Sequence, residues 1–290
     1  MNPSIESPKQ VVLPGSSETF TLRRLRSTED YDACVRLQQE TWGAGFTENV
    51  PATILMVSQK IGGVTAGAFD KNDSMVGFVF GLTGWKDGRP VHWSDMLAVK
   101  NELRNSGLGR ILKLYQRELV LPLGIKEIYW TYDPLVAKNA HLNFNKLGAE
   151  VSEYVSDMYP DNSGSELHRG IGMDRLIVVW RIESNRVKET LAGKKMVKPS
   201  DFDRVPVVNS KSDSKGFSVP VDAALPQASP VRIEIPADIQ SARNESVEMA
   251  RLWRSTTRKA FVHYLGRGYS VPAFLRDSQS GRCHYYLVKK

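Results

Sequence analysis

Apolar and polar positions follow two periods along this chain, and the periods predict its elements. Apolar residues at spacing two predict strands, and those at spacing three and four predict helices. The predicted order is strand, two helices, three strands, helix, strand, helix and two strands, over residues 20–25, 27–42, 51–61, 64–69, 75–82, 91–99, 107–121, 125–132, 135–147, 149–155 and 175–182. This order predicts a mixed α/β fold with helices on both faces of one sheet.

Short polar motifs mark the ends of several elements. The hydroxyl and acidic residues of Ser27–Asp30 are typical of a helix start. The polar residues Asp70–Asp73 stand between two apolar runs and predict a hairpin. The helix over 107–121 is amphipathic, and its pattern puts Lys113 on the outer side.

The same patterns divide the chain into parts. We expect a disordered tail over 1–18, one α/β domain over 19–187, a linker over 188–229 and a smaller α/β region over 230–290. The last region reads as a strand at 231–235, a helix, and strands at 269–276 and 283–289. One face of that helix is apolar (Met249, Trp253, Ala260, Phe261, Tyr264), and a separate stripe is basic (Arg251, Arg254, Arg258). The apolar face could serve a homodimer as readily as docking within the chain.

The composition bounds the class of protein. The chain has 290 residues, of which 41% are hydrophobic and 24% charged, as in ordinary globular proteins. No apolar run approaches the ~18 residues of a membrane-spanning helix, so we expect no membrane partner. The N-terminus lacks the order of a signal peptide. Cys34 and Cys283 make neither a disulfide framework nor a metal quartet, so we expect no metal and a cytoplasmic protein.

Positive charge is concentrated in the last third of the chain. The net charge is +7, and residues 191–290 hold 17 basic and 9 acidic residues. Such a region can be a solvated face, or can contact a phosphate-rich small molecule, the rest of the chain or nucleic acid. Nucleic acid is the least favoured partner, because the sequence has no helix-turn-helix, zinc-finger or RNA-binding signature.

The strongest chemical motif is the segment Arg104-Asn105-Ser106-Gly107-Leu108-Gly109-Arg110, between a predicted strand and a predicted helix. Successive backbone N–H groups at such a turn form an anion site, to which the helix adds its positive end. The two glycines let a pyrophosphate approach the backbone, and the two arginines add charge. The motif is neither a Walker loop nor a dinucleotide fingerprint. A purely structural turn is the alternative.

This segment resembles the central motif of the GNAT superfamily of acyltransferases, which bind acyl-coenzyme A. The strand ending in Leu97-Ala98-Val99, the RxxGxG turn and the helix follow the family order, and so do Asn139-Ala140 and Lys146-Leu147-Gly148 later in the chain. The likeness covers roughly residues 19–185. It implies a GNAT fold, and the segments RIEIPADIQ, WR, TR and GY resemble a GNAT group with a long C-terminal extension. The extension has the element order of a second GNAT half, which predicts a degenerate half-domain docked on the complete one.

The resemblance implies a role for several residues. Arg104–Arg110 would hold the pyrophosphate, the backbone of Leu97, Ala98 and Val99 would pair with the pantetheine arm, and Asn139 would contact the cofactor. Asp95 stands where many relatives carry a general base, and a salt-bridged strand residue is the alternative. His92 lies on the same strand. Because the two residues are three apart, they share one site only if a bulge intervenes.

The general acid departs from the family pattern. Many relatives carry a tyrosine where this chain has Phe144, which cannot donate a proton. Asn143, Tyr132 or His141 could substitute for it, or the thiolate could leave unassisted, since thiols have a pKa near ~8.5.

Polar residues near strand ends are candidates for the acceptor site. Asp133 could bind a substrate ammonium, or it could cap a turn before Pro134. His168, Arg169 and Arg175 could hold an acceptor carboxylate, or Arg175 could pair with a neighbouring aspartate. We expect Trp85 and Trp93 to line the core.

The sequence therefore predicts an enzyme that transfers an acyl group, acetyl by default, from acyl-CoA to an amine of a small molecule or amino acid. One alternative is a non-catalytic GNAT-fold protein that binds acyl-CoA for regulation. Another is a nucleic-acid-associated protein that uses the basic third.

Overall fold

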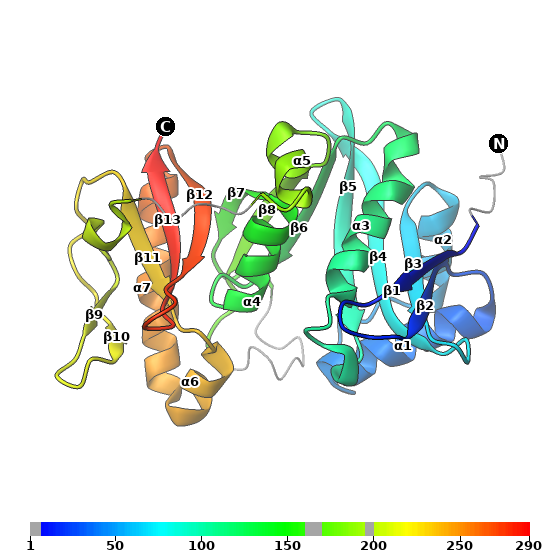
Figure 1. Ribbon diagram of the computed structural model, residues 1–290, viewed down its shortest axis with the longest axis horizontal. Helices are drawn as coiled ribbons and strands as arrows, with labels where there is room; N and C mark the ends of the chain where they lie inside the picture. Colours follow the sequence, from blue (N-terminus) through cyan, green and yellow to red (C-terminus); the bar gives the residue numbers. More distant parts are fainter. Residues whose placement is uncertain (1–6, 160–169, 195–199) are drawn as a thin grey trace. The chain divides into compact units, whose positions relative to one another are not determined.

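The computed structural model describes residues 7–159, 170–194 and 200–290 (Figure 1). These residues form two compact units, and the division falls between Trp130 and Thr131, inside strand β6 (Glu127–Tyr132). The domain limits expected at residues 187 and 229 remain predictions.

The first unit is built on a mixed sheet, as the sequence predicts. Its strand order is β1-β2-β3-β4-β5-β6. Pairs are antiparallel from β1 to β5, and the β5–β6 pair is parallel. Its elements are β1 (Lys9–Val12), β2 (Thr19–Arg24), α1 (Thr28–Trp42), α2 (Ala52–Lys60), β3 (Val64–Phe69), β4 (Met75–Lys86), β5 (Arg89–Val99), η1 (Asn101–Leu103), α3 (Leu108–Val120), η2 (Leu121–Leu123) and the first part of β6.

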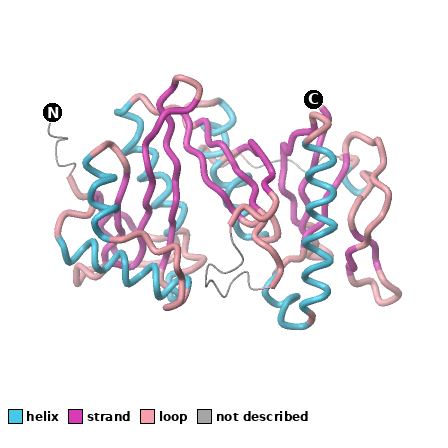
Figure 2. Tube along the Cα trace, turned by 180° about the vertical axis from the view of Figure 1, so that it is seen from behind, coloured by secondary structure: helices cyan, strands magenta, loops and turns pink. Residues whose placement is uncertain are grey.

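Helices cover both faces of this sheet, which confirms the predicted layering. Figures 1 and 2 place α3 on one face, and α1 with α2 on the other. Apolar side chains of α1 and α2 form a buried cluster with strands β4 and β5, including Tyr31, Leu37, Leu55, Phe78 and Met96. A capping box at Ser27 and Asp30 starts α1, as predicted.

The prediction of a tail over residues 1–18 is wrong for residues 9–12, which form the edge strand β1. This strand pairs antiparallel with β2, and Lys9 makes a 2.7 Å ion pair with Glu118 of α3. A four-residue edge strand carries too few apolar positions to show a period. Residues 1–6 lie outside the described residues.

Strand β5 contains one extra residue relative to β4. Phe80 pairs with Met96 and Gly81 pairs with Ser94, so Asp95 is the bulged residue. The bulge exchanges the faces of the strand. Before it, Ser94 reaches α3 through Lys113. After it, Met96 faces the α1–α2 cluster.

The second unit holds two groups of strands with the same arrangement. The order in the first group is β6-β8-β7, and in the second it is β11-β13-β12, so the third strand lies between the other two in both. In each group a helical segment joins the first strand to the second. The elements are α4 (Ala137–Ala140), η3 (His141–Leu147), β7 (Glu150–Val155), β8 (Arg175–Arg181), α5 (Asn185–Leu191), η5 (Phe202–Arg204), β9 (Ser210–Ser212), β10 (Ser218–Pro220), β11 (Val231–Ile235), α6 (Ile239–Glu245), α7 (Val247–Leu265), β12 (Tyr269–Arg276) and β13 (Cys283–Lys289).

The predicted apolar face of α7 is largely covered within the second unit. Trp253, Ala260, Phe261 and Tyr264 are buried, whereas Met249 is exposed. The Phe261 ring lies 5.0 Å from that of Tyr285 in β13. This packing accounts for the face without a second copy of the chain, and the homodimer stays a prediction.

Two segments differ from the predicted secondary structure. The helix expected over 135–147 is a short α4 followed by a wide π-helical turn at His141–Leu147. The stretch expected as a linker over 188–229 contains the end of α5, the η5 turn and the β9–β10 pair. Phe202 in this stretch is buried against His284. Its apolar residues are isolated, so they produce no period.

Candidate functional site

The segment Arg104–Arg110 forms a tight turn between β5 and α3. Gly107 caps the helix with φ of 93°, and Asn105 also adopts a positive φ, of 65°. Ser106 Oγ accepts a hydrogen bond from the Leu108 amide at 3.4 Å. The first N–H groups of a helix have no acceptor within it, so this end of α3 carries partial positive charge. The turn therefore has the local geometry of an anion site.

Among the residues that the structure describes, none requires glycine at position 109. A Cβ built there would meet no atom nearer than Leu97 Cδ2, at 3.8 Å, and its backbone is helical. Glycine in a helix costs about 0.5–1 kcal/mol relative to alanine. At Gly107 the left-handed φ itself favours glycine, and the nearest atom to an added Cβ is 3.9 Å away. An added Cβ at either glycine would make only ordinary van der Waals contacts, and Gly107 is exposed, so a ligand can approach the backbone here.

Side chains of β5 and α3 frame this turn. Val99 and Leu97 both approach Gly109, while Ala98 is buried on the opposite face in the α1–α2 cluster. Arg104 is exposed and Arg110 is half-buried. The end of β5 and the two glycines thus lie together at the N-terminal end of α3, and Arg104 and Arg110 flank them in the sequence.

Asp95 lies at the bulge of β5, and its side chain is exposed. Neighbouring atoms that limit the hydration of its carboxyl group raise its pKa, and the Glu48 carboxylate acts in the same direction. A hydrogen bond from Trp93 opposes both effects. A carboxylate with a raised pKa is a better proton acceptor than an ordinary aspartate.

His92 is fully buried and does not meet Asp95. Its Nε2 lies 3.0 Å from Gln116 Nε2 on α3, and its Nδ1 lies 3.1 Å from Thr83 Oγ1. Burial lowers the pKa of the imidazole to about 3, and Lys113 adds to the effect. Strand β5 does contain a bulge, which the sequence requires if His92 and Asp95 are to share a site. The bulge lies after Ser94, however, so His92 and Asp95 remain on opposite faces of the strand. This placement favours a structural role for His92.

Lys113 is buried, which corrects the prediction that it lies on the outer side of α3. Its Nζ donates to Ser94 Oγ at 2.7 Å and lies 3.9 Å from the centroid of the Trp130 ring. Burial holds the pKa of this ammonium well below its ordinary value. The helical period misses the residue because a long polar side chain can occupy a core position when a hydroxyl and a ring receive its end.

The candidates for a general acid lie in the second unit. Tyr132 is buried, its hydroxyl lies 3.2 Å from that of Tyr285, and burial raises its pKa. Asn143 and Phe144 are also buried, and the Phe144 ring packs edge-on against Tyr285. His141 is exposed, with a pKa lowered by burial of its ring and by nearby cations. Because Tyr132 is buried, its hydroxyl group has little contact with solvent.

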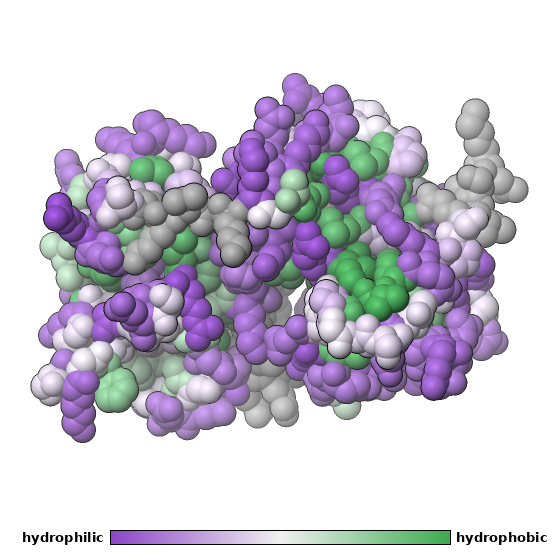
Figure 3. Space-filling model, in the orientation of Figure 1, coloured by the Kyte–Doolittle hydropathy of each residue, from purple (hydrophilic) through white to green (hydrophobic). Residues whose placement is uncertain are grey.

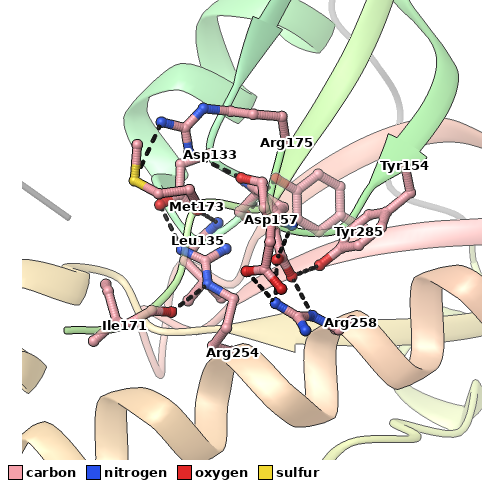
Figure 4. Close-up of polar contacts among 12 residues, drawn as sticks. Asp133, Leu135, Tyr154, Asp157, Ile171, Met173, Arg175, Arg254, Arg258 and Tyr285 are labelled. Atoms are coloured by element: carbon pink, nitrogen blue, oxygen red, sulfur yellow. Dashed lines mark hydrogen bonds and ion pairs between the residues drawn. The ribbon is translucent and has the colours of Figure 1, made fainter. Parts of the chain in front are cut away.

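Asp133 is a buried ion-pair partner, which favours a structural role over the predicted binding of a substrate ammonium. Its Oδ2 lies 2.6 Å from Arg254 Nη2 of α7, and its Oδ1 accepts a hydrogen bond from the Leu135 amide at 2.8 Å (Figure 4). The alternative of a turn cap is confirmed by the Leu135 contact. The sequence shows no sign of the ion pair, because its two residues are 121 positions apart.

A second network lies beside this pair. Arg258 of α7 bonds Asp174 and Asp157, with its Nε 2.8 Å from Asp174 Oδ2, and Tyr154 donates to the same carboxylate (Figure 4). Arg175 is buried and donates to the backbone carbonyl of Asp174 at 2.9 Å. Its expected pairing with an aspartate side chain therefore gives way to a bond with the main chain.

Asn139 lies in α4, and its side chain is exposed. His168 and Arg169 lie outside the described residues. Trp85 is 78% exposed, so its expected place in the core is wrong, and Trp93 is half-buried. The face seen in Figure 3 is mostly hydrophilic, with apolar side chains gathered in separate patches.

No family model and no curated protein matches this chain. It is similar to solved structures of acetyltransferases. A chain of the NatC complex, solved with Gag peptide and CoA, is 14% identical with a TM-score of 0.46, over 56% of this chain and 98% of that one. Naa50 of Arabidopsis thaliana, with a bisubstrate analogue, is 18% identical with a TM-score of 0.44, over 55% and 97%. The ribosomal-protein-S18-alanine N-acetyltransferase of Escherichia coli is 18% identical with a TM-score of 0.44, over 57% and 95%.

Identities this low leave the substrate to be inferred from the residues of this chain itself. Within the described ranges, no group of three or more histidine, cysteine, aspartate or glutamate residues is placed to hold a metal ion. Likewise, no helix among these residues is long and apolar enough to cross a membrane.

Proposed function

We propose that this chain is an acyl-CoA-dependent N-acyltransferase of the GNAT type. It transfers an acyl group, acetyl by default, directly to an amine of a small molecule or amino acid. One observation carries the proposal: Gly107 and Gly109 stand at the N-terminus of α3, between Arg104 and Arg110, where an added Cβ would meet only ordinary van der Waals contacts. The resemblance of this segment to the GNAT motif supports coenzyme A as the ligand.

The turn supplies the binding energy for the phosphates. The amides of the first turn of α3 donate to the pyrophosphate oxygens, and the Arg104 and Arg110 guanidinium groups offset its charge. The backbone of Leu97–Val99 pairs with the pantetheine arm. The backbone at the end of β5 also polarises the thioester carbonyl.

Asp95 supplies the proton acceptor. An amine attacks only as the free base, so the substrate ammonium first gives a proton to the Asp95 carboxylate, directly or through water. The amine nitrogen then bonds to the carbonyl carbon and releases its second proton to solvent, and the carbon–sulfur bond breaks. The thiolate leaves with the electron pair and takes a proton from solvent, which a thiol pKa near ~8.5 permits.

A second candidate function is binding of acyl-CoA without turnover. The buried Phe144 stands where relatives carry a tyrosine, and the Tyr132 hydroxyl is engaged with Tyr285. These two observations favour a regulatory binding protein over an enzyme that needs a general acid. Release of free thiol in a broad screen of amines separates the two functions.

Calorimetric titration with coenzyme A, acetyl-CoA and dephospho-CoA tests the cradle. We expect saturable binding of thiol and thioester by the native chain, and a loss of at least tenfold in Gly107→Glu and Arg104→Glu. Gly88→Glu and Arg89→Glu are matched controls, since Gly88 also has a positive φ and both residues are exposed. Equal affinity in all five proteins would refute the site.

A further inference from the structure

The second unit contains a basic cavity that the proposed transferase chemistry does not use. Its volume is about 750 Å³, and one face of α7 lines most of it. Its basic lining residues are Arg251, Arg254, Arg258, Lys259 and His263 of α7, and Arg267 just after this helix. Among the described residues that line the cavity there is no aspartate or glutamate.

Carboxylates outside the cavity neutralise only part of this charge. Arg254 pairs with Asp133, Arg258 with Asp174 and Asp157, and Lys259 with Asp222. Arg251 and Arg267 instead donate to backbone carbonyl oxygens, of Gly170 at 2.8 Å and of His263 at 3.2 Å. Among the described residues, no carboxylate forms an ion pair with either of these two arginines, and both line the cavity.

Two buried nitrogen atoms of this face have no hydrogen-bond partner among the described residues. They are Nη1 of Arg254 and Nε2 of His263. Arg254 is only 3% exposed, so Nη1 receives little help from solvent, and its other two groups already bond Asp133 and the Ile171 carbonyl. A buried guanidinium N–H without an acceptor is costly, and an oxyanion in the cavity would satisfy it.

We propose that this cavity binds the phosphate group of a small molecule. A dianion matches several convergent guanidinium and ammonium groups better than a single carboxylate does, and the Ser156 and Ser255 hydroxyls lining the cavity can bond its remaining oxygens. The cavity has the size of a small-molecule site. The apolar Val262 side chain in the wall of the cavity can contact an uncharged part of the ligand.

The site shares no residue with the turn at Arg104–Arg110, because all its described residues belong to the second unit and the turn belongs to the first. Titration with inorganic phosphate and with glycerol phosphate is therefore done in the Gly107→Glu background, which removes the proposed coenzyme site. We expect saturable binding there. Arg251→Gln and His263→Gln should each weaken it at least fivefold, while Arg276→Gln, an exposed arginine of β12 outside the cavity, should leave it unchanged.

Two results of these titrations would overturn the proposal, and a competition experiment adds a third. One is the absence of saturable phosphate binding at tens of millimolar. The other is equal affinity in all the variants. A single-stranded oligonucleotide added as competitor tests the nucleic-acid alternative: if it binds through Arg251 and His263 far more tightly than glycerol phosphate, the face serves a polymer and the small-molecule proposal fails.

Discussion

Arg254 of α7 and Asp133 form an ion pair with almost no contact with water, at 2.6 Å between Nη2 and Oδ2. The Asp133 carboxylate raises the pKa of Arg254 against the opposing effect of burial. The pair fastens the C-terminal helix to the segment after β6. An aspartate that reads as a substrate ligand in the sequence is thus part of the framework of the second unit.

Removing either partner of this pair should destabilise the protein strongly. Arg254→Met leaves a buried carboxylate without its cation, and we expect a loss of about 3–5 kcal/mol in the free energy of unfolding. The double variant Asp133→Asn/Arg254→Met should recover part of that loss, because it buries no unpaired charge. Urea denaturation of the two single variants and the double variant measures the coupling. Additive losses would contradict a coupled pair.

Gly109→Ala should separate stability from binding. The added methyl group meets no atom within 3.8 Å and favours the helix, so the free energy of unfolding should rise by about 0.5–1 kcal/mol. The same methyl group intrudes on the proposed pyrophosphate position, so coenzyme A affinity should fall. Urea denaturation and calorimetry give the two numbers. A stabilised variant that binds coenzyme A normally would mean that Gly109 has no ligand role.

Buried His92 should make the protein less stable in mild acid. Its pKa is about 3 in the folded state against 6.5 when free, so the unfolded chain binds the extra proton between these values. Stability is then fully present above about pH 6.5 and is lost as the pH falls towards 3. At about pH 5 the loss from this one group is roughly 2 kcal/mol.

His92→Gln removes the titrating group and can keep the contact with Gln116. Its unfolding free energy should therefore change less between about pH 7 and pH 5 than that of the native chain. His141→Gln serves as the comparison, because the pKa of His141 is lowered less than that of His92, so its removal should change the pH dependence less. If both variants show the native pH dependence, the imidazole of His92 is not the source.

Asp95→Asn should slow acyl transfer and spare coenzyme A binding. Loss of a general base typically costs 10²–10⁴ in rate. The raised pKa of Asp95 also places the acidic limb of the rate profile above the ordinary range of an aspartate, and this limb should disappear in the variant. Thiol release across pH with an accepted amine measures both effects. An unchanged rate and profile would remove Asp95 from the mechanism.

Periodicity predicts most of the first unit, because its strands and helices each bury one regular face. The order from β2 to β6, the hairpin after β3 and the start of α3 all follow from the sequence. Edge strand β1 escapes prediction because only a few of its residues are apolar. Trp85 escapes it too, since an aromatic residue in a strand suggests the core, whereas here it lies where β4 runs on past its buried part.

Contacts between residues far apart in the sequence explain why the roles of the candidate acceptor-binding residues are harder to predict. Arg254 belongs to a stripe that reads as a solvated helix face, yet it is buried against a residue 121 positions away. Likewise, the Asp174 carboxylate forms an ion pair with Arg258, whereas the neighbouring Arg175 bonds only its main-chain carbonyl. Local patterns contain no information on such partners. The turn at Arg104–Arg110 is predicted well because its chemistry is local.

The extra residue in β5 shifts the alternation of its side chains between the two faces of the sheet by one position. Ahead of Asp95, even-numbered side chains are directed towards α3, and beyond it the odd-numbered ones are. Deleting Asp95 would restore simple alternation with β4, and every side chain from Met96 to Val99 would exchange faces. Leu97 and Val99 would leave the neighbourhood of Gly109, and Met96 and Ala98 would leave the α1–α2 cluster. One inserted residue thus lets a single strand direct the appropriate side chains to the helices on each face of the sheet.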